Sequence, residues 1–186
     1  VWSKHGMIKG HMSREIDSKV LSKLDSWEKD SPPGPIALYI RLMRIQIEAK
    51  SQITVQKSQL SPDIIAERMS LHAPLLTFDD LVLDWSKMEN LFREALLVIS
   101  EYFDSVDPQS DIPLEDIARA WYEGKPLPKL GIDKDTLYVA LHTALEPFLA
   151  AHASVLLQEV NQKGWRRGYC PICGGSPNFA FLSKEQ

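Results

Sequence analysis

The sequence predicts an all-α protein, and three observations support this fold class. Apolar residues recur every three or four positions over several long stretches, which is the period of a helix with one buried face. Clusters of proline and glycine separate those stretches, and no stretch before Tyr169 alternates apolar and polar residues as a strand does. The chain has 186 residues, which is enough for one well-buried domain.

The first two predicted helices lie on either side of a proline-rich break. The helix over residues 13–30 ends at the sequence SPPGP, which cannot continue it. Pro35 suits the first turn of the second helix, over 36–55, whose broad apolar surface predicts burial on more than one side. The sequence KGHM resembles an expression-vector remnant, so residues 1–11 are set aside and the helical domain is expected over 12–164.

Capping residues place the next two helices. Ser61 and Pro62 predict a short helix that begins there, because serine caps a helix and proline fits its first turn. A longer helix follows over residues 85–103 with an apolar stripe on one face, and Asp79 or Asp80 is expected to cap it.

The last two helices complete the predicted domain. Residues 114–123 form a short helix that is expected to stop at Gly124. The longest helix is predicted over 134–162, capped by Asp133, and its apolar composition makes it the central element of the bundle. Pro147 lies inside this helix and is expected to kink it about one turn earlier, because proline removes a backbone hydrogen bond.

The sequence CPICGG holds the only two cysteines of the chain, Cys170 and Cys173. Thiolates at this spacing can reach one metal ion, because a tight turn points both sulfurs the same way. The proline between the cysteines stiffens such a turn, and the glycine after the second cysteine tolerates a left-handed backbone conformation. Tetrahedral zinc or iron–thiolate sites need four ligands, so the pair predicts half of a metal site, at the start of a metal-knuckle region over residues 165–186.

A thiol–disulfide redox centre is an alternative interpretation of the same residues, since CPIC is also found in glutaredoxin-like active sites. In those proteins the motif follows a strand and opens a helix, whose N-terminus lowers the pKa of the thiol. Here the pair follows a long predicted helix, and the sequence GGSP after it disfavours a new one. The metal knuckle is therefore the preferred interpretation, and a thiol oxidoreductase stays open as the weaker one.

The run WRRGYCPICGGSP, after an apolar helix containing LEPFLAAHA, resembles the formate dehydrogenase accessory protein family (FdhE), with HAPLL upstream as a weaker landmark. The resemblance spans about residues 35–181. It implies a helical domain followed by a rubredoxin-like region that binds iron through several Cys-x-x-Cys motifs. It also implies a cytoplasmic, chaperone-like protein that contacts the catalytic subunit of formate dehydrogenase to assemble or activate it. Only Cys170 and Cys173 carry over as metal ligands, because the family's further cysteine pairs are absent from this chain.

Two further groups of residues are candidates for binding the partner. Arg166 and Arg167 lie beside the cysteines and could bind an acidic segment, although cations also stabilise the C-terminal end of a helix. Trp121 and Tyr122 precede a proline-rich loop and could line a groove, although core packing is the alternative role. His152 falls on the apolar stripe of the long helix and is expected to be a hydrogen-bonded core histidine.

Composition and the absence of certain motifs argue against several classes of function. A net charge of -4 argues against a general nucleic-acid-binding protein. No apolar run approaches the roughly 18 residues of a membrane span, and no phosphate-binding loop or catalytic triad occurs. We therefore expect a cytoplasmic binding protein rather than an enzyme. The resemblance implies iron, or else zinc, for the full-length family pattern, and we expect no metal or an incomplete site in this chain.

Two other interpretations stay open. One is a zinc-ribbon module on a helical scaffold, which binds a regulatory protein or nucleic acid. The other concerns the assembly of the chain: two copies could pair their cysteines and complete a four-sulfur site as a homodimer.

Overall fold

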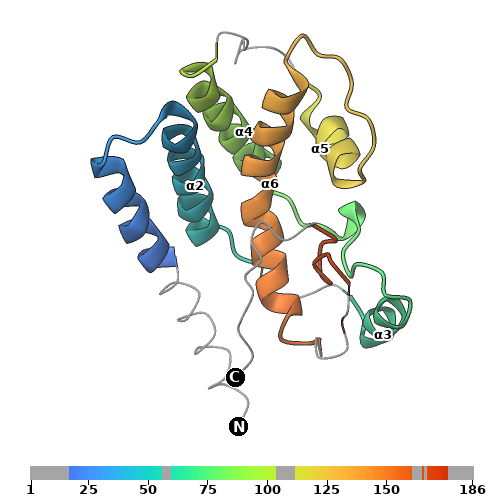
Figure 1. Ribbon diagram of the computed structural model, residues 1–186. Coiled ribbons are helices and arrows are strands. Elements are labelled where there is room, and N and C mark those ends of the chain that lie inside the picture. The colour runs from blue at the N-terminus through green and yellow to red at the C-terminus, as the bar shows by residue number, and fades with distance from the viewer. Residues whose placement is uncertain (1–16, 56–59, 104–111, 161–164, 166, 176–186) are drawn as a thin grey trace. The chain divides into compact units, whose positions relative to one another are not determined.

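All regular elements that the computed structural model describes are helices, and the predicted all-α class is confirmed (Figure 1). No strand occurs within the described ranges. The predicted vector remnant lies outside them. The structure describes residues 17–55, 60–103, 112–160, 165 and 167–175.

The chain divides into two compact units that interleave in sequence. The first contains Val1–Ile53 and Asp84–Pro147, and the second contains Thr54–Leu83 and Phe148–Gln186. This division differs from the boundary predicted after residue 164. The cysteine region does not stand apart from the helical region but shares its unit with two helical segments.

In the first unit, ion pairs join α2 (Gly34–Gln52) to the helix over residues 17–29. Arg44 on α2 donates hydrogen bonds to Asp25 at 2.5 Å and to Glu28 at 2.9 Å. Such partly exposed pairs contribute only about 0–1 kcal/mol each. The apolar side chains buried on both helices therefore contribute more to this packing than the ion pairs do.

The helix α4 (Trp85–Ser100) packs against α2, and its N-terminal cap is Asp84. Asp84 Oδ1 accepts a hydrogen bond from an amide of the first turn at 3.1 Å. The prediction that Asp79 or Asp80 caps this helix was wrong. Both residues belong to the short 3-10 helix η1 (Phe78–Asp80), and the extended residues between η1 and α4 leave the capping position to Asp84.

Local signals correctly placed α5 (Leu114–Tyr122) and the start of α6 (Lys134–Leu156). Gly124 adopts φ 67 directly after α5, which is the left-handed conformation that ends many helices. Asp133 accepts a hydrogen bond from the amide of Thr136 at 2.9 Å and so caps α6 as predicted.

The helix α6 ends earlier than predicted and continues through Pro147. From Gln158 the amides donate to carbonyls only three residues earlier in the chain, as from Glu159 to Leu156 at 2.9 Å. The predicted end, Gln162, lies outside the described residues. The kink expected from Pro147 stays a prediction.

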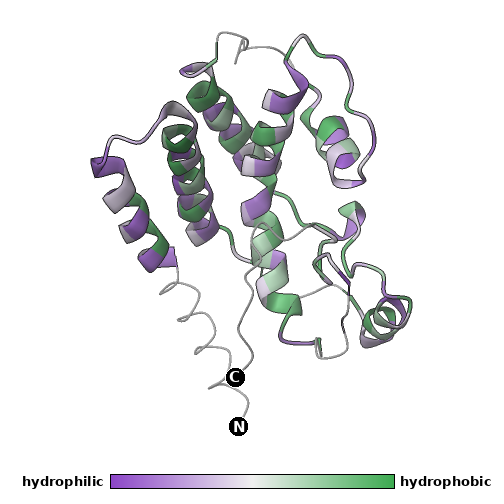
Figure 2. Cartoon of the chain, viewed as in Figure 1, coloured by the Kyte–Doolittle hydropathy of each residue, from purple (hydrophilic) through white to green (hydrophobic). Residues whose placement is uncertain are grey.

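Within the described ranges, α6 is the one helix that is long and apolar enough to cross a membrane by length and composition alone. Figure 2 shows its long hydrophobic stretches. Its most apolar window is 61% buried inside the protein, which also fits the core helix of a globular unit.

Candidate functional site

The two cysteines lie in a tight turn over residues 170–175, called here the cysteine turn. The amide of Cys170 donates to the carbonyl of Gly175 at 2.8 Å, and the amide of Gly174 donates to the carbonyl of Cys170 at 2.9 Å. Gly174 has φ 75, a conformation that glycine adopts without a steric penalty. The backbone thus closes on itself around Cys170 and Cys173, as the sequence CPICGG predicts.

Backbone hydrogen bonds anchor the cysteine turn to the HAPLL segment, residues 72–76. The amide of Leu75 donates to the carbonyl of Pro171 at 2.9 Å, and the amide of Leu76 donates to the carbonyl of Ile172 at 2.8 Å. Ile172 is fully buried and packs with Leu75, Leu76 and the end of α6. Two segments that are far apart in sequence therefore form one structural element.

An aromatic cluster joins the residues before the cysteine turn to the HAPLL segment. The indole N–H of Trp165 donates to the carbonyl of Tyr169 at 2.8 Å, and the hydroxyl of Tyr169 donates to the carbonyl of His72 at 2.7 Å. The ring of Trp165 lies 5.4 Å from that of Tyr169 and 6.0 Å from that of His72, between centroids. These contacts tie the residue just before Cys170 to the start of the HAPLL segment.

A charged pair holds the other end of the HAPLL segment. Arg68, on α3 (Pro62–Ser70), donates to the carbonyl of Leu75 and, at 2.7 Å, to Asp80 Oδ2. Asp80 also accepts from the hydroxyl of Thr77 at 2.7 Å and from its amide at 2.8 Å. Burial alone raises the pKa of Asp80, but the hydrogen bonds from Thr77 and Arg68 outweigh it and lower that pKa. The carboxylate is thus kept ionised beside Arg68.

The environment of Cys170 favours its thiolate form, and no disulfide joins Cys170 to Cys173. The largest effect on the pKa of Cys170 is a hydrogen bond from the side chain of Cys173, which lowers that pKa. Burial opposes it, but the amides of Cys173 and Ile172 add further hydrogen bonds, and together these lower the pKa of Cys170 to about 5. A thiolate with amides directed at it can bind a metal ion or act as a nucleophile.

The described residues supply two sulfur ligands at this turn and contain no group of three or more His, Cys, Asp or Glu side chains that could hold a metal. The donor set of the turn fits half of a tetrahedral thiolate site, because both sulfurs belong to one rigid turn with amides directed at Cys170. The prediction of a half site at Cys170 and Cys173 stays a prediction.

The predicted partner-binding residues fall into different units. Arg167 is exposed, in the second unit, and Arg166 lies outside the described residues. Trp121 and Tyr122 are half-buried on α5 in the first unit.

Trp121 packs within the first unit. Its ring centroid lies 5.5 Å from that of Tyr138 and 6.0 Å from that of His142, both on α6. Its indole N–H is buried and has no hydrogen-bond partner within the described part of the chain. These contacts match the core-packing alternative rather than an open groove at this position.

His152 on α6 is a hydrogen-bonded core histidine, as predicted. Its side chain is 5% exposed, and Nε2 accepts a hydrogen bond from the amide of Val82 at 3.0 Å. Burial lowers the pKa of His152. Protonation of Nε2 would also break the bond from Val82, so the folded protein holds this ring neutral.

This histidine makes the stability of the protein depend on pH. Its pKa is lower in the folded chain than the unfolded value of 6.5, so between these two values only the unfolded chain binds the proton. We expect the contribution of His152 to be complete above about pH 6.5 and to be lost as the pH falls towards the folded pKa. Urea unfolding at a series of pH values measures it. His152→Gln, which does not titrate, should show a flatter profile, and equally steep profiles would contradict the assignment.

Sequence reasoning missed the residues that hold the cysteine turn in place, namely His72, Leu75 and Arg68. For His72 and Leu75 the only signal was the HAPLL landmark, which no pattern along the chain connects to CPIC, and Arg68 had no such signal. Their roles depend on backbone carbonyls and amides, which carry no sequence signature.

No family model, no curated protein and no solved structure matches this chain.

Proposed function

We propose that this chain is an accessory, chaperone-like protein for formate dehydrogenase, which binds the catalytic subunit of that enzyme during assembly or activation. In this proposal Cys170 and Cys173 are half of a thiolate site for iron, with zinc as the alternative metal, at the start of a rubredoxin-like region. The chain acts by binding and is not itself an enzyme.

One observation supports the proposal: the HAPLL segment holds the cysteine turn in place. The backbone bonds to Leu75 and Leu76 and the buried Ile172 set the position of the turn. A preformed turn lowers the entropy lost when a metal binds, which suits a resident metal site. Both segments are landmarks of the family resemblance, and their pairing supports treating them as one functional element.

When bound, a metal at this site would link the two thiolates to ligands from outside the cysteine turn. The residues of this chain would supply the sulfurs and the amides directed at Cys170. The chain itself contains two cysteines, so further thiolate ligands would come from another polypeptide segment or a second copy.

Binding of the purified catalytic subunit of formate dehydrogenase to this chain tests the proposal. We expect a complex with a measurable dissociation constant, detected by calorimetry, and we expect any metal that the complex holds to depend on both cysteines. Cys170→Ser combined with Cys173→Ser should remove the metal. Absence of binding to the subunit would refute the accessory role. Zinc alone, together with salt-dependent binding to DNA or RNA, would favour the zinc-ribbon module instead.

A thiol oxidoreductase is the second candidate, because the pKa of Cys170 is lowered to about 5. Thiols of that class usually lie at a helix N-terminus, whereas residues 170–175 form a turn stabilised by other backbone segments. An assay of insulin disulfide reduction separates the two candidates. Multiple turnovers by the purified chain would overturn the accessory proposal, and we expect none.

A further inference from the structure

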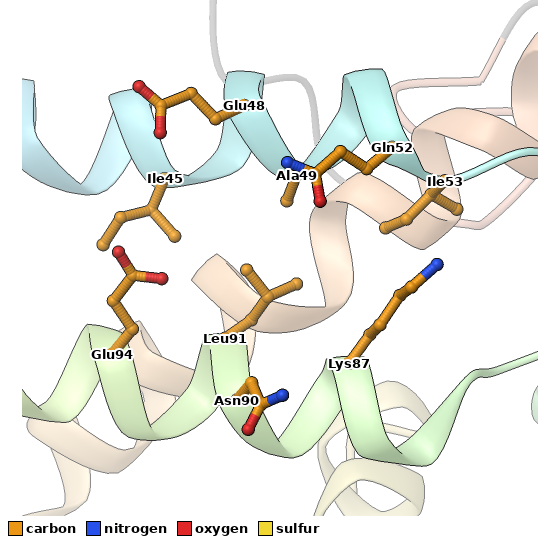
Figure 3. A pocket seen from close by; sticks show the side chains of 9 residues that line it. All are labelled: Ile45, Glu48, Ala49, Gln52, Ile53, Lys87, Asn90, Leu91 and Glu94. Atoms are coloured by element: carbon orange, nitrogen blue, oxygen red, sulfur yellow. The ribbon is translucent and has the colours of Figure 1, made fainter.

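A groove in the first unit runs between α2 and α4 and has a volume of about 230 Å³ (Figure 3). Its floor is apolar, with Ile45 and Ala49 from α2 and Leu91 from α4. Polar side chains form its edges: Glu48, Gln52, Lys87, Asn90 and Glu94. This volume lies below the roughly 300–1,000 Å³ of typical small-molecule sites, so the groove suits one long side chain better than a cofactor.

The charges along the groove are separated. Figure 3 shows Glu94 beside Ile45 towards one end, and Lys87 extending towards Gln52 and Ile53 at the other. Glu94 and Lys87 are seven residues apart on α4, or about 10 Å along the helix. One end is therefore acidic and the other is basic.

Within the described residues, no cation pairs with the two carboxylates at the acidic end of the groove. The acidic residues of α2 and α4 are Glu48, Glu89 and Glu94, and of these Glu89 is paired with Arg93 at 2.9 Å. Within the described part of the chain, neither of the other two carboxylates has an ion-pair or hydrogen-bond partner. The two acids without partners are thus the two that line the groove.

The cations of the same helices already have acidic partners. Arg41 binds Glu101, Arg44 binds Asp25 and Glu28, Lys50 binds Asp17, Lys87 approaches Asp84 at 3.6 Å, and Arg93 binds Glu89. Every cation on α2 and α4 thus has an acidic partner, and the exposed Glu48 and Glu94 are open to a cation from outside these two helices. Its apolar stem would lie on the groove floor, as the stems of arginine and lysine do on apolar surfaces.

We propose that the groove between α2 and α4 binds an arginine or lysine side chain of the partner protein, with the cation beside Glu48 and Glu94. This inference rests on the proposed function, since it locates the surface that contacts the catalytic subunit. Arginine fits better than lysine, because its guanidinium can bond two carboxylates at once and is common at interface centres. The surface is distinct from Trp121, Tyr122, Arg166 and Arg167, the residues that sequence analysis favoured.

The test compares binding of purified formate dehydrogenase catalytic subunit to the unmodified chain and to Glu48→Gln combined with Glu94→Gln. The double variant loses charge-assisted hydrogen bonds and should bind the subunit roughly tenfold or more weakly. Its remaining affinity should depend less on salt concentration. Glu89→Gln is the matched control, because it removes a charge from α4 outside the groove. Ala49→Met, which fills the floor without changing charge, should also weaken binding. Thermal unfolding of each variant checks that it is folded.

The outcomes separate the two proposals. If the unmodified chain does not bind the subunit, the accessory role fails, and this inference fails with it. If the chain binds but the double variant, Ala49→Met and Glu89→Gln all bind equally well, the groove is not the contact surface while the accessory role stands. Weaker binding of the double variant and of Ala49→Met, with Glu89→Gln unchanged, supports both.

Discussion

Replacing Ile172 with alanine is expected to lower the free energy of unfolding by about 2–5 kcal/mol. The side chain is 0% exposed and packs with Leu75, Leu76 and Leu156. Truncation removes buried methyl groups and leaves a cavity that these neighbours only partly fill. The carbonyl of Ile172 also accepts a hydrogen bond from the amide of Leu76. The cavity would therefore lie where the cysteine turn meets the HAPLL segment.

Urea unfolding followed by circular dichroism measures this loss. Ile64→Ala is the matched control, since Ile64 lies on α3 in the same unit but is 37% exposed, and it should cost much less. The thiols give a second readout, because loosening the turn should increase their rate of reaction with a disulfide reagent. If Ile172→Ala and Ile64→Ala are equally stable, Ile172 does not pack as described.

Replacing Gly174 with alanine is expected to destabilise the cysteine turn by about 2–5 kcal/mol, for two separate reasons. At φ 75 any residue with a Cβ is strained, at a cost of roughly 1–2 kcal/mol. The new Cβ would also lie 2.9 Å from Pro74 Cγ, so the HAPLL segment or the turn must move, and such overpacking costs about 1–3 kcal/mol. The hydrogen bond from the Gly174 amide to Cys170 would weaken in consequence.

Two comparisons identify which reason dominates. Gly168→Ala should be nearly neutral, because a Cβ there meets nothing within 4 Å and the backbone is not left-handed. Combining Gly174→Ala with Pro74→Ala should restore the stability lost to the clash and leave the loss caused by backbone strain. Metal content measured on the same preparations shows whether the geometry of the turn matters for binding. A fully stable Gly174→Ala variant would contradict the close approach to Pro74.

The two stability predictions concern the same contact, between the cysteine turn and the HAPLL segment. The Ile172 variant tests the side-chain packing of this contact, and the Gly174 variant tests its backbone geometry. If both variants lose stability and metal together, the contact positions the sulfurs. If they lose stability alone, the turn keeps its sulfur geometry without the support of the HAPLL segment.

Much of the local structure could be predicted from the sequence. Ser61 and Asp133 cap the helices that they were expected to cap, and Gly124 ends α5 in the left-handed conformation. The tight turn at CPICGG was also predicted, including the need for glycine after the second cysteine. The errors lie where several local signals compete, as with Asp84, which caps α4 in place of Asp79 or Asp80.

The sequence by itself determined most of the helices, the caps at Ser61 and Asp133, and the cysteine turn, because those depend on hydrogen bonds and apolar spacing among residues a few positions apart. Only the tertiary structure decided that Leu75 and Leu76 pair with the cysteine turn, and that Glu48 and Glu94 share a groove. Backbone pairing leaves no side-chain signature, and whether a carboxylate has a partner depends on cations brought near by folding. Neither property can be obtained from periodicity or propensity along the chain.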